Sequence, residues 1–165
     1  MSSSFDLESV DHLTTGTVGP PGERVFFLQA RAGEMVVSLQ LEKTQVAALI
    51  RYLGTMLADL PPLGELPTEM DLVEPVVPEW VVGPIGVTYD EEADKVLLVV
   101  DELVEEDEEG ARARIAATRE QVAALAIHGA KVVAAGRPPC PLCGQPLDPR
   151  GHMCARLNGH RRLAR

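Results

Sequence analysis

Short hydrophobic stretches rich in residues that favour β-strands, such as Thr and Val, lie near the start of the chain. Glycine and proline residues separate them and predict tight turns, so that the second and third strands form a hairpin. Hydrophobic residues then recur every three or four positions over 43–60, which predicts an amphipathic helix that ends before Pro61. The three expected strands cover residues 12–19, 24–33 and 34–42.

The second half of the chain repeats this order of elements. A helix is expected over 119–135, where Thr118 and Gln121 have the spacing of a capping box. Between the two halves, residues 61–79 are rich in proline and acidic residues and predict an extended linker. The strands that precede the second helix are expected over 80–92, 94–106 and 111–118.

Both halves contain the segment QVAAL, at 45–49 and 121–125, and each copy opens a helix after a strand. Such a short identity can be a coincidence of similar helices, but the matching order of elements favours two copies of one unit. The sequence therefore predicts an α+β fold. Two β-β-β-α repeats form a mostly antiparallel sheet of about six strands, with both helices on one face and a zinc knuckle at the carboxyl end.

A change in charge divides the chain after residue 136. Residues 1–136 carry 9 Lys and Arg against 24 Asp and Glu, whereas 137–165 carry six Arg against Asp148 alone. We expect 1–136 to form a single duplicated domain and 137–165 to form a basic, zinc-binding tail. Within the domain, the two repeats and the linker are expected at about 5–60, 80–136 and 61–79.

All three cysteines lie in the tail, within the stretch CPLCGQPLDPRGHMC. Cys140 and Cys143 have the spacing of a metal knuckle, and His152 and Cys154 supply a second pair of ligands. Three thiolates and one imidazole fill a tetrahedral zinc shell, so we expect a structural zinc and no catalytic residue. The alternatives are a redox pair of cysteines, an iron–sulfur site, an empty site, or a catalytic zinc to which one of the four residues does not bind.

Three stretches of the sequence carry a family resemblance, namely TTGTVGPPGERVFFLQAR, QVAAL and AAGRPPCPLCGQPLDPRGHMCARLNGHRR. With them the chain resembles an uncharacterised actinobacterial family that is known only as a domain of unknown function. The resemblance covers nearly the whole chain and implies an actinobacterial, cytoplasmic protein without assigning an activity. It is closest at Cys140, Cys143, Gly144, Gly151, His152, Cys154, Arg156, Asn158 and Gly159.

Charge and motifs together favour a non-enzymatic binding or scaffold protein in the cytoplasm. No segment has the length and hydropathy of a membrane span, and the start of the chain does not have the form of a secretory signal. The tail would face a negatively charged protein partner, or it would dock on the acidic domain of the same chain or of a second copy. A nucleic-acid-binding accessory protein using the same tail is the first alternative, and an enzyme with its site between the repeats is the second. The residues expected to contact the partner are Arg150, Arg156, Asn158, Arg161 and Arg162.

Overall fold

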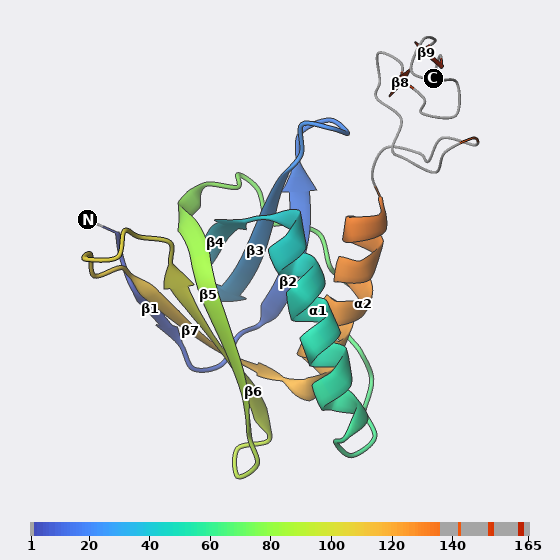
Figure 1. Ribbon diagram of the computed structural model, residues 1–165. Helices are drawn as coiled ribbons and strands as arrows, with labels where there is room; N and C mark the ends of the chain where they lie inside the picture. Colours follow the sequence, from blue (N-terminus) through green and yellow to red (C-terminus); the bar gives the residue numbers. More distant parts are fainter. Residues whose placement is uncertain (1, 136–141, 143–151, 154–161, 164–165) are drawn as a thin grey trace.

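The computed structural model describes residues 2–135, 142, 152–153 and 162–163. Seven strands of the described chain form one sheet, and two helices lie side by side against it (Figure 1). The helices are α1 (Lys43–Ala58) and α2 (Arg119–Ala134). The strands of this sheet are β1 (Phe5–Leu7), β2 (His12–Val18), β3 (Val25–Ala32), β4 (Met35–Leu41), β5 (Pro78–Asp90), β6 (Lys95–Glu102) and β7 (Arg112–Thr118).

The order of the strands across the sheet is β1-β7-β6-β5-β4-β3-β2. Strands β2, β3 and β4 form one antiparallel meander followed by α1, and β5, β6 and β7 form a second one followed by α2. The two meanders join where β4 and β5 pair in parallel. The predicted α+β class, with two β-β-β-α units and a mostly antiparallel sheet, is therefore confirmed.

The sheet curls so far that one segment bridges its two edges. Strands β1 and β2 lie at opposite ends of the strand order, yet only residues 8–11 separate them in the chain. The Val10 N–H donates to the Ala116 carbonyl of β7, and the next N–H, of Asp11, donates to the Arg31 carbonyl of β3. Strand β1 itself was not predicted, because three residues are too few to show an alternating pattern.

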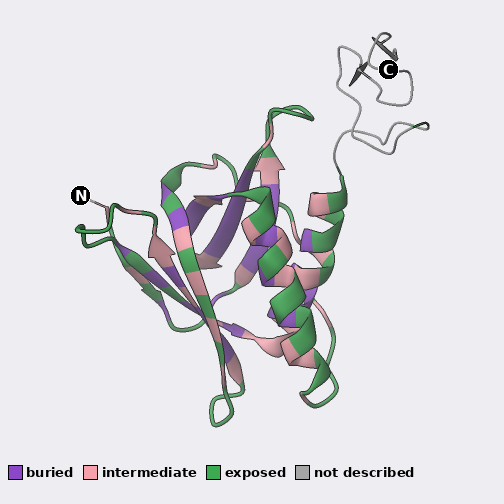
Figure 2. Cartoon of the chain, viewed as in Figure 1, coloured by how far each residue is buried: buried purple, intermediate pink, exposed green. Residues whose placement is uncertain are grey.

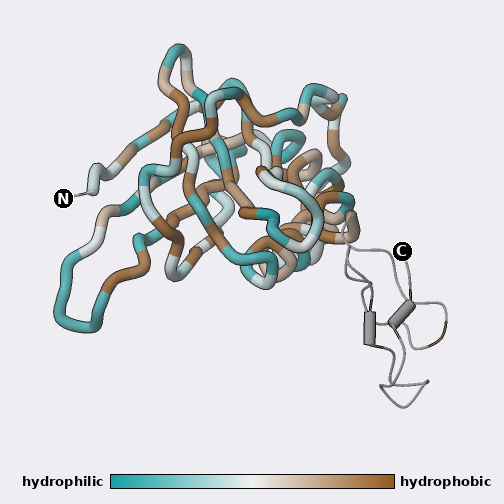
Figure 3. Tube along the Cα trace, turned by 90° about the horizontal axis from the view of Figure 1, so that it is seen from above, coloured by the Kyte–Doolittle hydropathy of each residue, from teal (hydrophilic) through white to brown (hydrophobic). Residues whose placement is uncertain are grey.

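Hydrophobic side chains from both units form a single core inside the curled sheet (Figure 2). Along β6, buried and partly exposed residues alternate, as the spacing of two residues per repeat requires. Hydrophobic and hydrophilic stretches follow each other closely along the chain (Figure 3). Helix α2 approaches α1 and β2 closely at Gly129. A Cβ atom at this glycine would lie 2.7 Å from Ile50 and 3.3 Å from Thr15, so the close packing depends on the missing side chain.

The segment that joins the two units, residues 61–77, contains no helix or strand, and its residues 70–73 contact β2 and β3. The side chain of Gln29, which is completely buried in β3, donates to the Val73 carbonyl at 3.0 Å and accepts from the Val73 N–H at 2.7 Å. The hydroxyl of Thr14 on β2 donates to the Met70 carbonyl. The segment is therefore fastened to the sheet through its own backbone.

Neither helix of the described chain has the length and the apolar character that crossing a lipid bilayer requires.

Candidate binding groove

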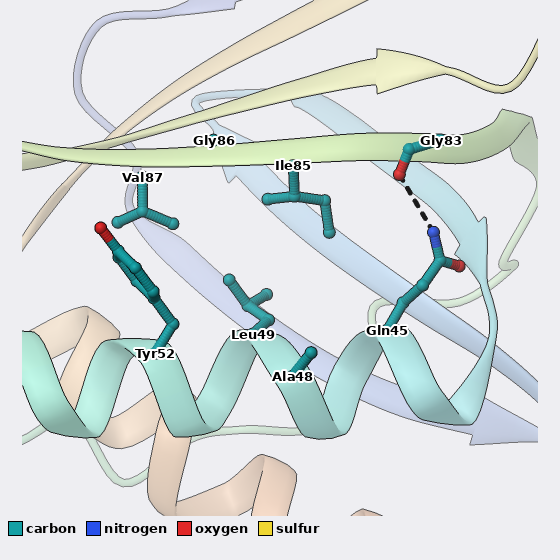
Figure 4. A pocket seen from close by; sticks show the side chains of 8 residues that line it. All are labelled: Gln45, Ala48, Leu49, Tyr52, Gly83, Ile85, Gly86 and Val87. Carbon is teal, nitrogen blue, oxygen red and sulfur yellow. Dashed lines mark hydrogen bonds between the residues drawn. The ribbon is translucent and has the colours of Figure 1, made fainter.

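A groove of about 500 Å³ runs between helix α1 and strand β5 (Figure 4). Ile85 and Val87 project from β5 toward the helix, and Leu49 and Tyr52 project from α1 toward the strand. Leu49 is buried in the floor of the groove, whereas Tyr52 stands at its rim with 56% of its surface exposed. The described lining consists of Gln45, Ala48, Leu49, Tyr52, Gly83, Ile85, Gly86 and Val87.

The local sequence explains why both walls are apolar. In β5, Ile85 and Val87 are two residues apart, so they share one face of the strand. In α1, Ala48 and Tyr52 are four residues apart and lie one above the other on one side of the helix. A register shift in β5 between Val82 and Ile85 bends the strand where the groove begins.

Gln45 closes the groove at the first turn of α1. Its side-chain oxygen accepts from the N–H of Glu42, the residue that caps the helix. Its side-chain nitrogen donates to the carbonyls of Val82 and Gly83 at 3.1 and 3.0 Å. Gln45 therefore fixes the start of the helix to the bend in β5 and sets the distance between the two walls.

Gln121 has the same two roles at the start of α2. Its side-chain oxygen accepts from the N–H of the capping residue Thr118, and its nitrogen donates to the Val10 carbonyl in the bend between β1 and β2. Each helix is thus tied to a bent segment of the other unit. The pair β5 and α1 therefore corresponds to the pair β2 and α2.

The corresponding space between α2 and β2 is only partly covered by the chain itself. Helix α2 packs directly on β2 where Gly129 meets Thr15, and hollows of about 420 and 620 Å³ remain beside residues 66–72. Residues 66–71 run along α2 beside Ala124 and His128. Leu72 then lies on β2, where a Cβ atom at Gly16 would come within 2.8 Å of the leucine side chain. An extended segment of polypeptide therefore lies beside α2 and β2, whereas the described lining of the α1–β5 groove contains no such segment.

The two helices differ at equivalent positions because an extended segment partly covers only one of them. Ala124 on α2 is buried, but Ala48, its counterpart in the repeated QVAAL segment, is exposed. His128 on α2 is half-buried, and its counterpart Tyr52 is exposed. The α1–β5 groove thus presents alanine, leucine, isoleucine, valine and tyrosine side chains without a segment like the one beside α2 and β2.

Beyond the groove along β5, Arg119 joins three parts of the chain. Its guanidinium contacts Asp94, in the turn between β5 and β6, through two hydrogen bonds of 2.7 and 3.3 Å, and it donates to the Pro61 carbonyl at 2.7 Å. The hydroxyl of Tyr89 donates to the same carboxylate at 2.7 Å. Hydrogen bonds from Arg119 and then Tyr89 lower the pKa of Asp94, and the bond to Asp94 raises the pKa of Tyr89.

The predicted zinc ligands Cys140, Cys143 and Cys154 lie outside the described residues. For the fourth, His152, the structure gives a backbone position in the short strand β8 (His152–Met153), which pairs antiparallel with β9 (Arg162–Leu163). The zinc site therefore stays a prediction. Of the predicted partner-binding residues, Arg162 lies in β9, and Arg150, Arg156, Asn158 and Arg161 lie outside the described residues.

The sequence placed a possible site between the two repeats, as the enzyme alternative, but it did not identify the residues that line the α1–β5 groove, although two features of this groove were visible. Gln45 opens the first QVAAL segment, and Ile85 and Val87 alternate with small or polar residues in the expected strand 80–92. The missing information was which helix faces which strand. Each helix packs against the other unit, and that exchange cannot be read from the order of elements alone.

Comparison with known protein families gave one match. The family described as Protein of unknown function (DUF3090) matches residues 5–154, from β1 through the last predicted zinc ligand. No curated protein and no solved structure matched the chain.

Proposed function

We propose that this chain, which belongs to the DUF3090 family, is a non-enzymatic binding protein that holds an extended segment of a partner protein in the α1–β5 groove. A single observation carries the proposal: an extended polypeptide, residues 66–72, lies beside α2 and β2, the counterparts of α1 and β5 in the repeated fold. The fold therefore contains one helix–strand pair that an extended segment partly covers and one that the described chain leaves open.

The chemistry of the groove suits an apolar peptide. Ala48, Leu49, Ile85 and Val87 offer hydrocarbon surface, which gains about 25 cal/mol for each Å² removed from water. Tyr52 at the rim combines a large apolar ring with a hydroxyl that can bond to a peptide backbone. Aromatic and aliphatic anchors around a concave apolar floor are typical of sites that bind peptide segments.

We further propose that the tail binds one structural zinc through Cys140, Cys143, His152 and Cys154. The spacing of these residues and the preference of zinc for thiolate and imidazole ligands support this assignment. The surrounding arginines would then contact acidic residues of the partner, in the cytoplasm. The residues proposed for this contact are Arg150, Arg156, Arg161 and Arg162, with Asn158 between them.

A peptide-display experiment tests the proposed groove. Phage that display random twelve-residue peptides would be selected on the full-length, zinc-loaded protein, and an enriched peptide would be added to isotopically labelled protein. We expect enriched peptides to contain apolar residues and to shift the NMR signals of Tyr52, Ile85 and Val87. If no peptide is enriched, or if the shifts lie on a different face, the proposal is wrong.

A nucleic-acid partner would give a different result. Binding of RNA or DNA oligomers would weaken steeply with added salt, because each phosphate contact releases counterions. Such binding would leave the signals of Tyr52, Ile85 and Val87 unchanged. The same labelled protein therefore distinguishes a peptide in the groove from a nucleic acid on the basic tail.

A further inference from the structure

Resting on the proposed function, we infer that the partner segment pairs with the free edge of strand β5 and so becomes an additional strand of the sheet. Every second side chain of the segment would enter the α1–β5 groove, so the partner supplies a stretch of alternating apolar and polar residues. Three properties of β5 support this pairing: the point where its contact with β4 stops, the alternation of its exposed residues, and the bonds that Gln45 makes to its backbone.

The second half of β5 has a neighbouring strand on one side only. On that side, β6 pairs with β5 as far as Asp90. On the other side, β4 ends at Leu41, and its last partner on β5 is Val81. Within the described chain, no other strand pairs along this side of residues 84–90, and no further backbone–backbone hydrogen bond reaches them. The N–H and C=O groups that point away from β6 therefore form an open edge, with which an extended chain can pair.

The exposure of β5 shows that this edge is accessible. Residues 83–90 alternate between half-buried and exposed, and none of them is buried. Ile85 and Val87 face α1, whereas Thr88 lies on the opposite, exposed face of the strand (Figure 4). A strand added at this edge would alternate in the same way, with one side chain toward the groove and the next toward solvent. Apolar residues at every second position of the partner therefore suit the site.

Gln45 takes the place of a neighbouring strand at the start of this edge. Its side-chain nitrogen donates to the carbonyls of Val82 and Gly83, directly after the last residue of β5 that pairs with β4 (Figure 4). At the far end, Arg119 joins the turn that follows β5 to the carbonyl of Pro61. The open edge thus lies between two fixed points, and its length suits a short linear segment of a partner.

Strand pairing would give the groove a register that apolar contact alone does not provide. Burial of apolar surface is non-directional, so a purely apolar groove would accept any order of side chains. In a paired strand, a slip by one residue turns every apolar side chain from the groove to solvent. A segment with alternating residues should therefore bind, and a segment of the same composition with its apolar residues in one block should not.

Two synthetic peptides test this pairing on full-length, zinc-loaded, isotopically labelled protein. The probe, acetyl-KTVTVTVTK-amide, alternates apolar and polar residues, and the control, acetyl-KTTTTVVVK-amide, has the same composition in two blocks. Amide hydrogen exchange is followed by NMR. We expect the probe to slow exchange at least tenfold at those of residues 85–88 whose N–H points away from β6, and to shift the methyl signals of Ile85 and Val87. The control should do neither, and unchanged exchange with both peptides would overturn the inference.

Backbone methylation of a display-selected peptide provides the second arm. Only every second N–H of an added strand points to its neighbour. N-methylation at one set of alternate positions should therefore weaken binding at least tenfold, and N-methylation at the other set should change it less than twofold. Equal losses for the two sets would overturn the pairing.

The two arms separate this pairing from the proposed function. If the peptide shifts the Tyr52 signals but both methylated sets lose affinity equally, the proposed function stands and the pairing is wrong. If exchange along β5 slows while the signals of Tyr52, Ile85 and Val87 stay unchanged, the pairing stands and the groove is not the site. If exchange at residues 85–88 depends on protein concentration without any peptide, the edge belongs to a contact between two copies, and the inference is wrong.

Discussion

The side-chain amide of Gln29 forms hydrogen bonds with both the N–H and the carbonyl of Val73. The side-chain amide of Gln29 donates to the Val73 carbonyl and accepts from the Val73 N–H, and it also donates to the Ser38 hydroxyl at 3.0 Å. The sheet thus holds an extended segment through hydrogen bonds to its main chain, although Val73 is 44 residues away from Gln29 in the sequence.

Replacing Gln29 with leucine should loosen the segment 61–77. The substitution leaves the N–H and carbonyl of Val73 without a partner, which we expect to lower the free energy of unfolding by about 2–4 kcal/mol in urea titrations. Cleavage by a glutamate-specific protease at Glu69 should become faster. The control Gln40→Leu, on the neighbouring strand β4, should change stability by less than about 1 kcal/mol. Equal effects of the two substitutions would contradict the role of Gln29.

Two helical glycines should respond to alanine in opposite directions. Gly129→Ala places a methyl group 2.7 Å from Ile50, so we expect a net loss of about 1–2 kcal/mol despite the better helix propensity. Gly54→Ala, on the exposed side of α1, meets no atom within 4 Å and should gain about 0.5–1 kcal/mol. Thermal unfolding of both variants measures the difference. A gain at Gly129 would show that α2 does not pack as closely as described.

Asp94 should make part of the stability depend on pH. Its pKa is lowered in the folded protein by Arg119 and then Tyr89, so its contribution is complete above the ordinary value of 3.8 and is lost as the pH falls through the lower folded value. Asp94→Asn should therefore flatten the stability profile below about pH 4. Asp90→Asn, in the same turn, is the control because Asp90 does not contact Arg119. Urea midpoints at several pH values test this, and identical profiles for the wild type and Asp94→Asn would refute it.

The proposed zinc site predicts one metal ion per chain. Elemental analysis of purified protein should give one zinc, and Cys154→Ser or His152→Ala should reduce the metal affinity strongly, because each removes one of four ligands. His160→Ala is the matched control, since His160 lies in the same segment outside the proposed ligand set. Retention of a full zinc equivalent by Cys154→Ser would exclude this residue as a ligand.

Local sequence patterns predicted the helices and most strands correctly. They did not predict how the two units pack against each other. The repeated QVAAL segments and the capping residue Thr118 indicated both helices, because spacing and capping act over a few residues. Strand β1 was missed because it is short and is defined by its pairing with β7. A site between the repeats was one alternative, but the residues of the groove were missed because they depend on contacts between Gln45 and a bend in the other unit, which no local pattern specifies.

Two alanines on adjacent positions of α1 offer the most direct test of the central claim, that the α1–β5 groove holds an extended polypeptide. Ala48 lines the groove, and Ala47 does not. The dissociation constant of one display-selected peptide would be measured for the full-length wild type, Ala48→Glu and Ala47→Glu. We predict at least a tenfold weaker affinity for Ala48→Glu, about 1.4 kcal/mol, and an unchanged affinity for Ala47→Glu. Equal affinities for all three proteins would contradict the claim.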